Sequence, residues 1–224
     1  MTGSPPQPAG PPLQPGPPLQ PGPPCPPQPA PSGPPAYPGS PAPADGGPRP
    51  DSARTLFSGH IIDLTVEQWG PNEREIVGHP GAVAIVPVDR DGNVVLVRQL
   101  REATRRWLLE LPAGGLKPGE EPLLCGRREL AEETGLVGGA WTLATTFWTT
   151  PGFCRELMWL YYAEGVEPGE RWTEPDPDED LEVVRWPLAE IAERLGEIED
   201  LKTLAGLLLY LRDRDGTTGS VPAR

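Results

Sequence analysis

The chain has 224 residues, of which 37% are hydrophobic and 23% charged, and its formal net charge at pH 7 is −13. This acidic balance argues against general binding to nucleic acids or anionic membranes, which needs a basic surface. The sequence also contains no run of about eighteen apolar residues, so it predicts no membrane span. The three cysteines are odd in number and lack metal-ligand spacing, which fits a protein of the reducing cytoplasm.

The first fifty residues are rich in proline. They hold 22 of the 34 prolines, and the sequence GPPLQP occurs twice in tandem from Gly10. Such a segment lacks the apolar content to bury a core and favours polyproline II or disorder. It also has neither the basic start nor the apolar run of a secretory signal peptide. We therefore expect residues 1–52 to form a disordered Pro/Gly-rich tail, which is either passive or a ligand for a proline-recognition module.

A small β segment follows the tail. Residues 53–77 predict two or three short strands, because β-branched and aromatic residues lie between turn signals at Gly59 and Pro71. A segment of this size cannot bury its own face. We therefore expect it to pack on another part of the protein.

The rest of the chain predicts a larger sheet flanked by helices. The dipeptide Asp91-Gly92 is a hairpin signal between two apolar strands, and Pro151-Gly152 separates two more strands. Mixed strands, a helix, and then further strands and helices imply α+β layers with the sheet between helices. We expect strands at residues 82–88, 93–100, 141–150, 157–166 and 181–186, and closing helices at 188–195 and 200–213. In the last helix Leu201, Leu204, Leu208 and Leu211 form one apolar stripe.

One helix in the middle of the chain concentrates acidic residues. Pro122 is tolerated in a first helical turn and Gly135 is typical of a helix end. Glu129 and Glu133 stand four residues apart and so share one face, where like charges destabilise a bare helix. A divalent cation such as Mg²⁺, which prefers hard oxygen ligands, would offset this repulsion; the alternative is a solvated acidic face. Leu123, Leu124, Leu130 and Ala131 fall on the opposite, core-facing side.

The spacing around this helix carries a family resemblance. The pattern Gly-x5-Glu-x7-Arg-Glu-U-x-Glu-Glu-x-Gly-U, in which U is a bulky apolar residue, is the Nudix box. The chain resembles Nudix hydrolases, which cleave nucleoside diphosphates linked to another group with Mg²⁺ or a similar cation. The residues that match are Gly114, Glu120, Arg128, Glu129, Leu130, Glu132, Glu133, Gly135 and Leu136.

A second set of motifs resembles the ADP-ribose pyrophosphatase branch of this family. The resemblance implies an α/β/α Nudix sandwich with a mixed sheet over residues 78–214, followed by a flexible C-terminus at 215–224. It also implies a homodimer that pairs through residues 53–77, and the hydrolysis of ADP-ribose to AMP and ribose 5-phosphate. The motifs are His79–Val83, Arg98–Arg101, Glu110–Gly114, Pro151–Phe153 and a final helix that begins near Asp200.

The resemblance also implies metal ligands. Glu129, Glu133 and the backbone carbonyl of Ala113 are expected to bind Mg²⁺, or Mn²⁺ in its place. Glu132 is expected to be a ligand of another cation or to be held through water. Arg128 is expected to orient a carboxylate through an ion pair without touching the substrate.

For the substrate, a nucleoside diphosphate derivative, the sequence offers several contacts. Arg101, at a strand end beside the box, is the expected phosphate contact. Arg98 is expected either to contact the substrate or to pair with Glu110. In the homodimer that the resemblance implies, Arg74 is expected to reach the substrate of the partner subunit. The residues considered for stacking on adenine are Phe57, Trp69 and Phe153.

The resemblance to the ADP-ribose pyrophosphatase branch also implies a general base in an acidic loop before a strand. Metal coordination occupies the helix glutamates, so a different carboxylate must take the proton of the attacking water. The register of this loop relative to the strand that follows it favours Glu179, then Asp178, with Glu156 as a competing site.

The alternatives for function are hydrolysis of a nucleotide-sugar, NADH or a dinucleoside polyphosphate, and a non-catalytic nucleotide-sugar sensor. The sensor predicts a damaged box or an attached DNA-binding domain.

Overall fold

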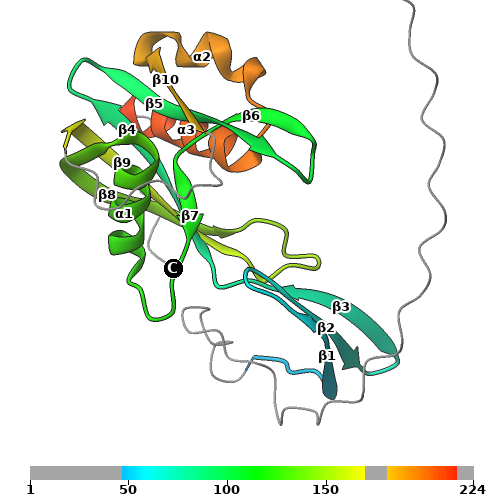
Figure 1. The fold of residues 1–224 in the computed structure, drawn as a ribbon. Helices are drawn as coiled ribbons and strands as arrows, with labels where there is room; N and C mark the ends of the chain where they lie inside the picture. The colour runs from blue at the N-terminus through cyan, green and yellow to red at the C-terminus, as the bar shows by residue number, and fades with distance from the viewer. Residues whose placement is uncertain (1–46, 170–180, 216–224) are drawn as a thin grey trace, which may run out of the picture. The chain divides into compact units, whose positions relative to one another are not determined.

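A computed structural model describes residues 47–169 and 181–215 (Figure 1). The described chain begins with an antiparallel three-stranded sheet in the order β1-β2-β3. The short strands predicted near residues 53–77 are therefore present. Their bounds are β1 (Ser52–Ser58), β2 (Asp63–Trp69) and β3 (Asn72–Gly78).

The second sheet has seven strands and is mixed. Its order is β10-β5-β4-β9-β8, with β6 paired to β5 and β7 to β4. The β4–β9 pair is parallel, whereas the β10–β5 and β8–β9 pairs are antiparallel. The expected α+β class with a mixed sheet is thus confirmed, although β6 and β7 were not anticipated. The strands are β4 (Ala82–Asp89), β5 (Asn93–Arg101), β6 (Arg106–Glu110), β7 (Ala113–Gly115), β8 (Leu136–Trp148), β9 (Leu157–Pro168) and β10 (Leu181–Pro187).

Strand β4 runs through the middle of three layers. Successive side chains of a strand point to opposite faces, and both faces of β4 are covered. Ala84 and Val86 belong to the core cluster under α3, and Val83 and Ile85 to the cluster under α1. Figure 1 shows α1 on one side of the sheet and α2 and α3 on the other. The helices are α1 (Pro122–Thr134), α2 (Ile191–Arg194) and α3 (Leu201–Arg214), with short 3-10 turns at Leu188–Glu190 and Leu195–Glu197 on either side of α2.

Helix α1 begins and ends where the sequence predicted. Pro122 lies in its first turn, and Gly135 closes it in the left-handed conformation with φ 69°, donating its N–H to the carbonyl of Ala131. The predicted apolar side was wrong at Leu124, which is 52% exposed. Cys125, fully buried, takes the core-facing position instead. The prediction from hydrophobic residue types favoured leucine and therefore missed Cys125, the residue that packs in the core.

The predicted stripe of α3 was wrong in part. Leu201 and Leu208 are 65% and 48% exposed, whereas the helix buries Thr203, Gly206, Leu207 and Tyr210. A Cβ at Gly206 would lie 2.6 Å from Leu111 Cδ1, so the small residue lets the helix approach the sheet. The docked face is therefore centred on this glycine.

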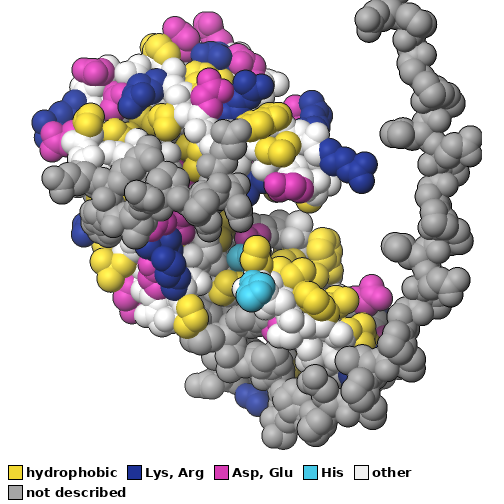
Figure 2. Space-filling model, in the orientation of Figure 1, with side chains coloured by type: hydrophobic (Ala, Val, Ile, Leu, Met, Phe, Trp, Pro, Cys, Tyr) yellow, Lys and Arg dark blue, Asp and Glu magenta, His cyan; other side chains and the backbone are white. Residues whose placement is uncertain are grey.

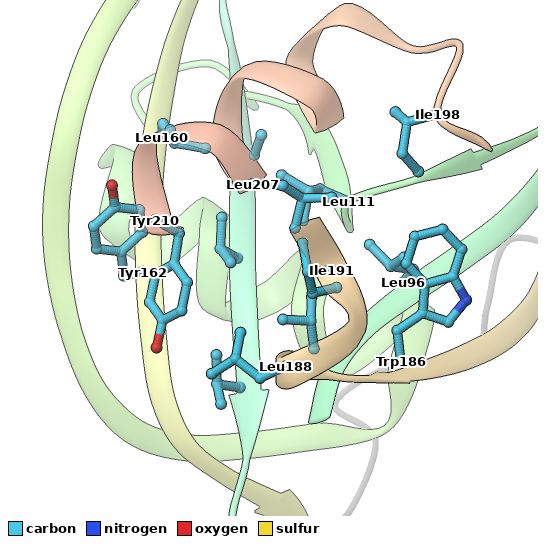
Figure 3. Packing of buried hydrophobic residues seen from close by; sticks show 14 of the residues in the cluster. Leu96, Leu111, Leu160, Tyr162, Trp186, Leu188, Ile191, Ile198, Leu207 and Tyr210 are labelled. Atoms are coloured by element: carbon cyan, nitrogen blue, oxygen red, sulfur yellow. The ribbon is translucent and has the colours of Figure 1, made fainter. Parts of the chain in front are cut away.

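The packing under α3 is visible in Figure 3. Leu207 faces Leu111, and Tyr210 lies beside Tyr162. The two tyrosine rings are 5.0 Å apart between centroids and meet edge to face, a favourable arrangement for aromatic pairs. The Tyr210 hydroxyl also donates to the Glu164 carboxylate at 2.6 Å. These contacts fix α3 against the sheet and thereby the position of its N-terminus.

The three-stranded sheet joins the larger one at the β8–β9 hairpin. The Val77 N–H donates to the carbonyl of Phe153 at 2.7 Å, and the Arg155 N–H donates to the carbonyl of Val77 at 2.9 Å. Figure 2 shows hydrophobic side chains gathered over this region. The exposed ones on the β1–β2 hairpin are Leu56, Phe57, Ile61 and Ile62. None of the helices in the described ranges is long and apolar enough to cross a membrane.

Candidate active site

The site is built around the contact between α1 and the short strand β7. Residues Ala113–Gly115 of β7 pair with β4, so the backbone of this segment is fixed. A Cβ at Gly114 would lie 2.1 Å from the Cδ and Oε1 atoms of Glu129. Only glycine fits a backbone this close to a carboxylate. The close contact with Glu129 thus explains why residue 114 of the Nudix box is a glycine.

Glu133 faces the same segment from the next turn of α1. It is 5% exposed, and its Oε2 accepts the N–H of Ala113 at 3.1 Å. A buried carboxylate is costly unless it is hydrogen-bonded, so this contact holds Glu133 in place. Glu129 and Glu133 therefore both face Ala113–Gly115, in agreement with their expected shared face.

Arg128 joins the acidic residues of the box. Its guanidinium donates to Glu120 at 2.8 and 2.9 Å, to Glu129 at 2.6 Å and to Glu132 at 2.9 Å. Glu120 precedes the helix, whose N-cap is Glu121, and its carboxylate also accepts the N–H of Lys117 at 2.9 Å. The hydrogen bond from Arg128 lowers the pKa of Glu120 from 4.5 to about 2, and the same bond raises the pKa of Arg128. This geometry suits the orienting role expected of Arg128.

The donor set fits a hard divalent cation. Within residues 47–169 and 181–215, no three Asp, Glu, His or Cys side chains gather into a ready-made metal site. Arg128 instead bridges Glu129 and Glu132. However, because Gly114 has no Cβ, the Glu129 carboxylate can occupy the space beside its backbone. Carboxylate and carbonyl oxygens are the ligands that Mg²⁺ prefers. The residues present are thus chemically suited to the expected ion.

A cleft of about 570 Å³ opens beside this segment. It lies between β7, the end of β8 and the start of α3. Its wall combines apolar and charged side chains, as in most small-molecule sites. The charged, aromatic and other large side chains in this wall include His79, Arg101, Phe147, Trp148, Glu156, Asp200, Leu201 and Lys202.

Arg101 lies in this cleft and is held by a buried acid. Its Nε and Nη2 donate to the two carboxylate oxygens of Glu110 at 2.8 and 2.7 Å. Glu110 is 1% exposed, whereas the Arg101 side chain is 40% exposed. Burial raises the pKa of Glu110, but the hydrogen bond from Arg101 and the charge of Lys202 outweigh burial and leave the pKa below 4.5. Glu110 therefore remains ionised.

The structure places Arg98 elsewhere. Arg98 pairs with Glu182 at 3.5 Å and lies over the ring of Trp107, 5.9 Å from its centroid. It lines a separate hollow of about 340 Å³. The arginine that pairs with Glu110 is therefore Arg101, and the expected alternative pairing of Arg98 with Glu110 was wrong.

Glu156 lines the cleft beside a histidine. Its Oε2 accepts the hydroxyl of Thr149 at 2.6 Å, and its Oε1 lies 3.8 Å from His79 Nε2. Burial lowers the pKa of His79, although the charge of Glu156 opposes this shift. Glu156 is thus among the cleft residues, as its expected role requires.

Among the described residues, Phe153 and Arg74 are not in the wall of the cleft. Phe153 is 55% exposed at the β8–β9 turn. Arg74 lies on β3 and donates to the carbonyl of Glu73 at 2.9 Å. Asp178 and Glu179 lie outside the described residues.

Trp148 and Lys202 are among the cleft residues that the sequence did not predict. Trp148 is 45% exposed at the end of β8, and Lys202 lies two residues after Asp200, the N-cap residue of α3. Lys202 is one of only two lysines in the chain, with Lys117. That rarity was the available signal for Lys202, whereas an aromatic residue within a strand carries no such signal.

The comparisons with known proteins agree with this geometry. The NUDIX domain family matches residues 78–207, which include the box and most of the cleft. The chain belongs to the Nudix family. The resemblance drawn from Gly114–Leu136 is therefore confirmed.

Known relatives narrow the comparison further. The chain is 41% identical over 164 residues to an ADP-ribose pyrophosphatase of Bacillus subtilis, covering 70% of this chain and 88% of the relative. It is 39% identical over 165 residues to an ADP-ribose pyrophosphatase of Mycobacterium tuberculosis, covering 70% and 80%. A solved structure of an ADP compounds hydrolase superposes with a TM-score of 0.65 at 24% identity, covering 78% of this chain and 98% of that one. This last likeness supports the Nudix fold.

Proposed function

We propose that this Nudix protein is a Mg²⁺-dependent pyrophosphohydrolase that cleaves ADP-ribose to AMP and ribose 5-phosphate. The observation that carries the proposal is the packing of Glu129 and Glu133 against Ala113–Gly115, at the edge of a cleft that also holds Arg101. The two relatives named ADP-ribose pyrophosphatase support this substrate.

The proposed reaction adds water across the pyrophosphate bond. The water oxygen forms a bond to one phosphorus, the bond from that phosphorus to the bridging oxygen breaks, and the water proton passes to a carboxylate base. Glu129, Glu133 and the carbonyl of Ala113 would hold the cation, and Glu132 would bind another cation or be held through water. The bound cation would neutralise charge on the phosphates.

The protein's own residues have separate tasks in this reaction. Arg101 binds a phosphate oxygen, and Glu110 keeps its guanidinium in place. Arg128 keeps the box carboxylates oriented through ion pairs. Glu179, Asp178 or Glu156 accepts the proton, and a carboxylate outside the metal ligands is suited to this because no cation would occupy its oxygens.

The N-terminal sheet is proposed to pair two copies of the chain. Its β1–β2 hairpin exposes Leu56, Phe57, Ile61 and Ile62, and exposed apolar patches are common at protein interfaces. In such a homodimer Arg74 of one copy would contact the substrate of the other.

A substrate panel with Mg²⁺ tests the proposal. Purified protein is incubated with ADP-ribose, a nucleotide-sugar, NADH and a dinucleoside polyphosphate, and kcat/KM is measured for each. We expect the highest value with ADP-ribose, by about tenfold or more. A higher value for another compound would reassign the substrate, and no hydrolysis of any compound would favour the non-catalytic sensor.

A further inference from the structure

Lys202 is a cation that enters the cleft from α3. Its ammonium donates to Glu110 Oε2 and, at 3.0 Å, to Asp200 Oδ2. Its side chain is 13% exposed and lines the cleft with Arg101 and Ala113. The sequence separation from Glu110 is 92 residues, so only the docking of α3 brings the two together.

Glu110 holds two cations side by side. Its carboxylate accepts Arg101 on both oxygens and Lys202 on one of them. Because Glu110 is 1% exposed and the two cations are 40% and 13% exposed, a ligand in the cleft meets the cations and not the acid behind them. The arrangement presents two positive groups at one wall.

Both cations retain donors. A lysine ammonium has three N–H groups and an arginine guanidinium has five. Within the described residues, the contacts to Glu110 and Asp200 use two of the donors of Lys202, and Glu110 uses two of those of Arg101. The remaining donors are available to a further oxygen ligand.

Asp200 binds the ammonium of Lys202 and also caps the N-terminus of α3. Its Oδ2 accepts the N–H of Thr203 at 2.9 Å and the Thr203 hydroxyl at 2.6 Å, and an acid at a helix N-terminus interacts favourably with the dipole. The Thr203 hydroxyl also accepts the N–H of Leu111 at 2.7 Å, next to Glu110. The position of Lys202 is therefore tied to the strand that carries its partner.

We propose that Lys202 is a substrate-binding residue that, together with Arg101, binds the pyrophosphate of a nucleoside diphosphate. This inference rests on the proposed function and adds to it a cation on α3. Charge-assisted hydrogen bonds to phosphate oxygens are strong, and a lysine ammonium is a compact point charge that can donate them. In this arrangement Lys202 contacts one of the two phosphates that the reaction separates.

The test separates this role from a purely structural ion pair. Lys202→Met removes the charge and keeps the side-chain length, and Lys202→Arg keeps the charge. Tyr210→Phe is a control that removes a partly buried hydrogen bond of the same helix, made by a residue that does not line the cleft. For each protein the KM for ADP-ribose, the inhibition constants of AMP and of ribose 5-phosphate, and the Tm are measured.

We expect Lys202→Met to raise the KM and the inhibition constant of one product by about tenfold, since a charged hydrogen bond is worth roughly that factor or more. Lys202→Arg should restore both values to within about threefold of the native protein. Tyr210→Phe should lower the Tm and leave the KM unchanged. An unchanged KM and unchanged inhibition constants in Lys202→Met, with only a lower Tm, would overturn the inference.

A second pair of variants covers the case in which Lys202→Met does not fold. Glu110→Gln removes the buried charge, and Glu110→Gln with Lys202→Met removes both. The same increase in KM between these two proteins supports the contact, and equal KM values contradict it. If the native protein releases AMP from ADP-ribose while the Lys202 variants match it, only the inference fails; if the native protein releases none, the proposed function fails and the inference with it.

Discussion

The carboxylate of Glu129 lies so close to the backbone of Gly114 that a Cβ at residue 114 would be 2.1 Å from Glu129 Cδ. A methyl group there must displace either the carboxylate or the β7 segment. The contact therefore couples the conformation of the loop to the position of a proposed metal ligand.

We predict that Gly114→Ala lowers kcat by about a hundredfold or more, because a misplaced ligand costs transition-state stabilisation. Gly196→Ala is the matched control, since no atom lies within 4 Å of a Cβ there. Steady-state kinetics and circular dichroism on both variants provide the measurement. Near-native turnover in Gly114→Ala would show that the carboxylate of Glu129 is not needed where it stands.

The Glu120–Arg128 pair predicts a pH dependence of stability. The pKa of Glu120 is lowered from 4.5 to about 2 by its hydrogen bond from Arg128. Because the folded-state pKa is the lower one, the stabilisation is fully present above pH 4.5 and is lost as the pH falls toward 2. We expect Glu120→Gln to reduce the free energy of unfolding by about 1 to 2 kcal/mol at pH 7.

Urea titrations of the native protein and Glu120→Gln between pH 7 and about pH 2 measure this effect. The difference between the two proteins should shrink over the pH window from 4.5 to 2. Glu197→Gln is the control, because Glu197 pairs with Arg194 at an exposed position, where ion pairs contribute little. A difference that is independent of pH would contradict the assigned partner.

The box was readable from the sequence because it is local. Helical periodicity alone puts Glu129 and Glu133 on one face, and Gly135 ends the helix through its own conformation. The docked face of α3 was not readable, because it depends on Gly206 meeting Leu111 from another element. A count of leucines carries no information about such a contact.

The charged wall of the cleft was also beyond local patterns. The β5–β6 hairpin sets Arg101 opposite Arg106 and leaves Glu110 within reach of the Arg101 guanidinium. Lys202 joins them from α3 after an interval of 92 residues. Partners at such separations follow from topology, which periodicity and spacing do not specify.

For the general base, we predict that Glu179→Gln lowers kcat much more than it raises KM, because proton transfer belongs to the transition state. A loss of about a hundredfold or more is expected. Parallel kinetics on Asp178→Asn and Glu156→Gln decide the assignment. A large loss of kcat in either of them, with Glu179→Gln near native, moves the role to that residue.

For assembly, we predict a particle of twice the 24.1 kDa chain mass by light scattering. Ile61→Lys, at a side chain that is 68% exposed on the β1–β2 hairpin, should shift the mass toward the monomer, because burying an unpaired charge at an interface is costly. Arg74→Ala should keep the dimer mass and raise the KM by about tenfold. A monomer mass for the native protein at working concentration would contradict the proposed role of the N-terminal sheet.

The most direct test of the account compares the native protein with Glu133→Gln on ADP-ribose. The amide keeps the shape of the side chain that accepts the Ala113 N–H and removes its charge. Chromatography of the products over time, with and without Mg²⁺, measures the reaction, and circular dichroism checks the fold. The account predicts AMP and ribose 5-phosphate in equal amounts from the native protein only with the metal, and turnover lower by about two to three orders of magnitude in a folded Glu133→Gln. Absence of AMP from the native reaction, or near-native turnover of Glu133→Gln at limiting Mg²⁺, would contradict it.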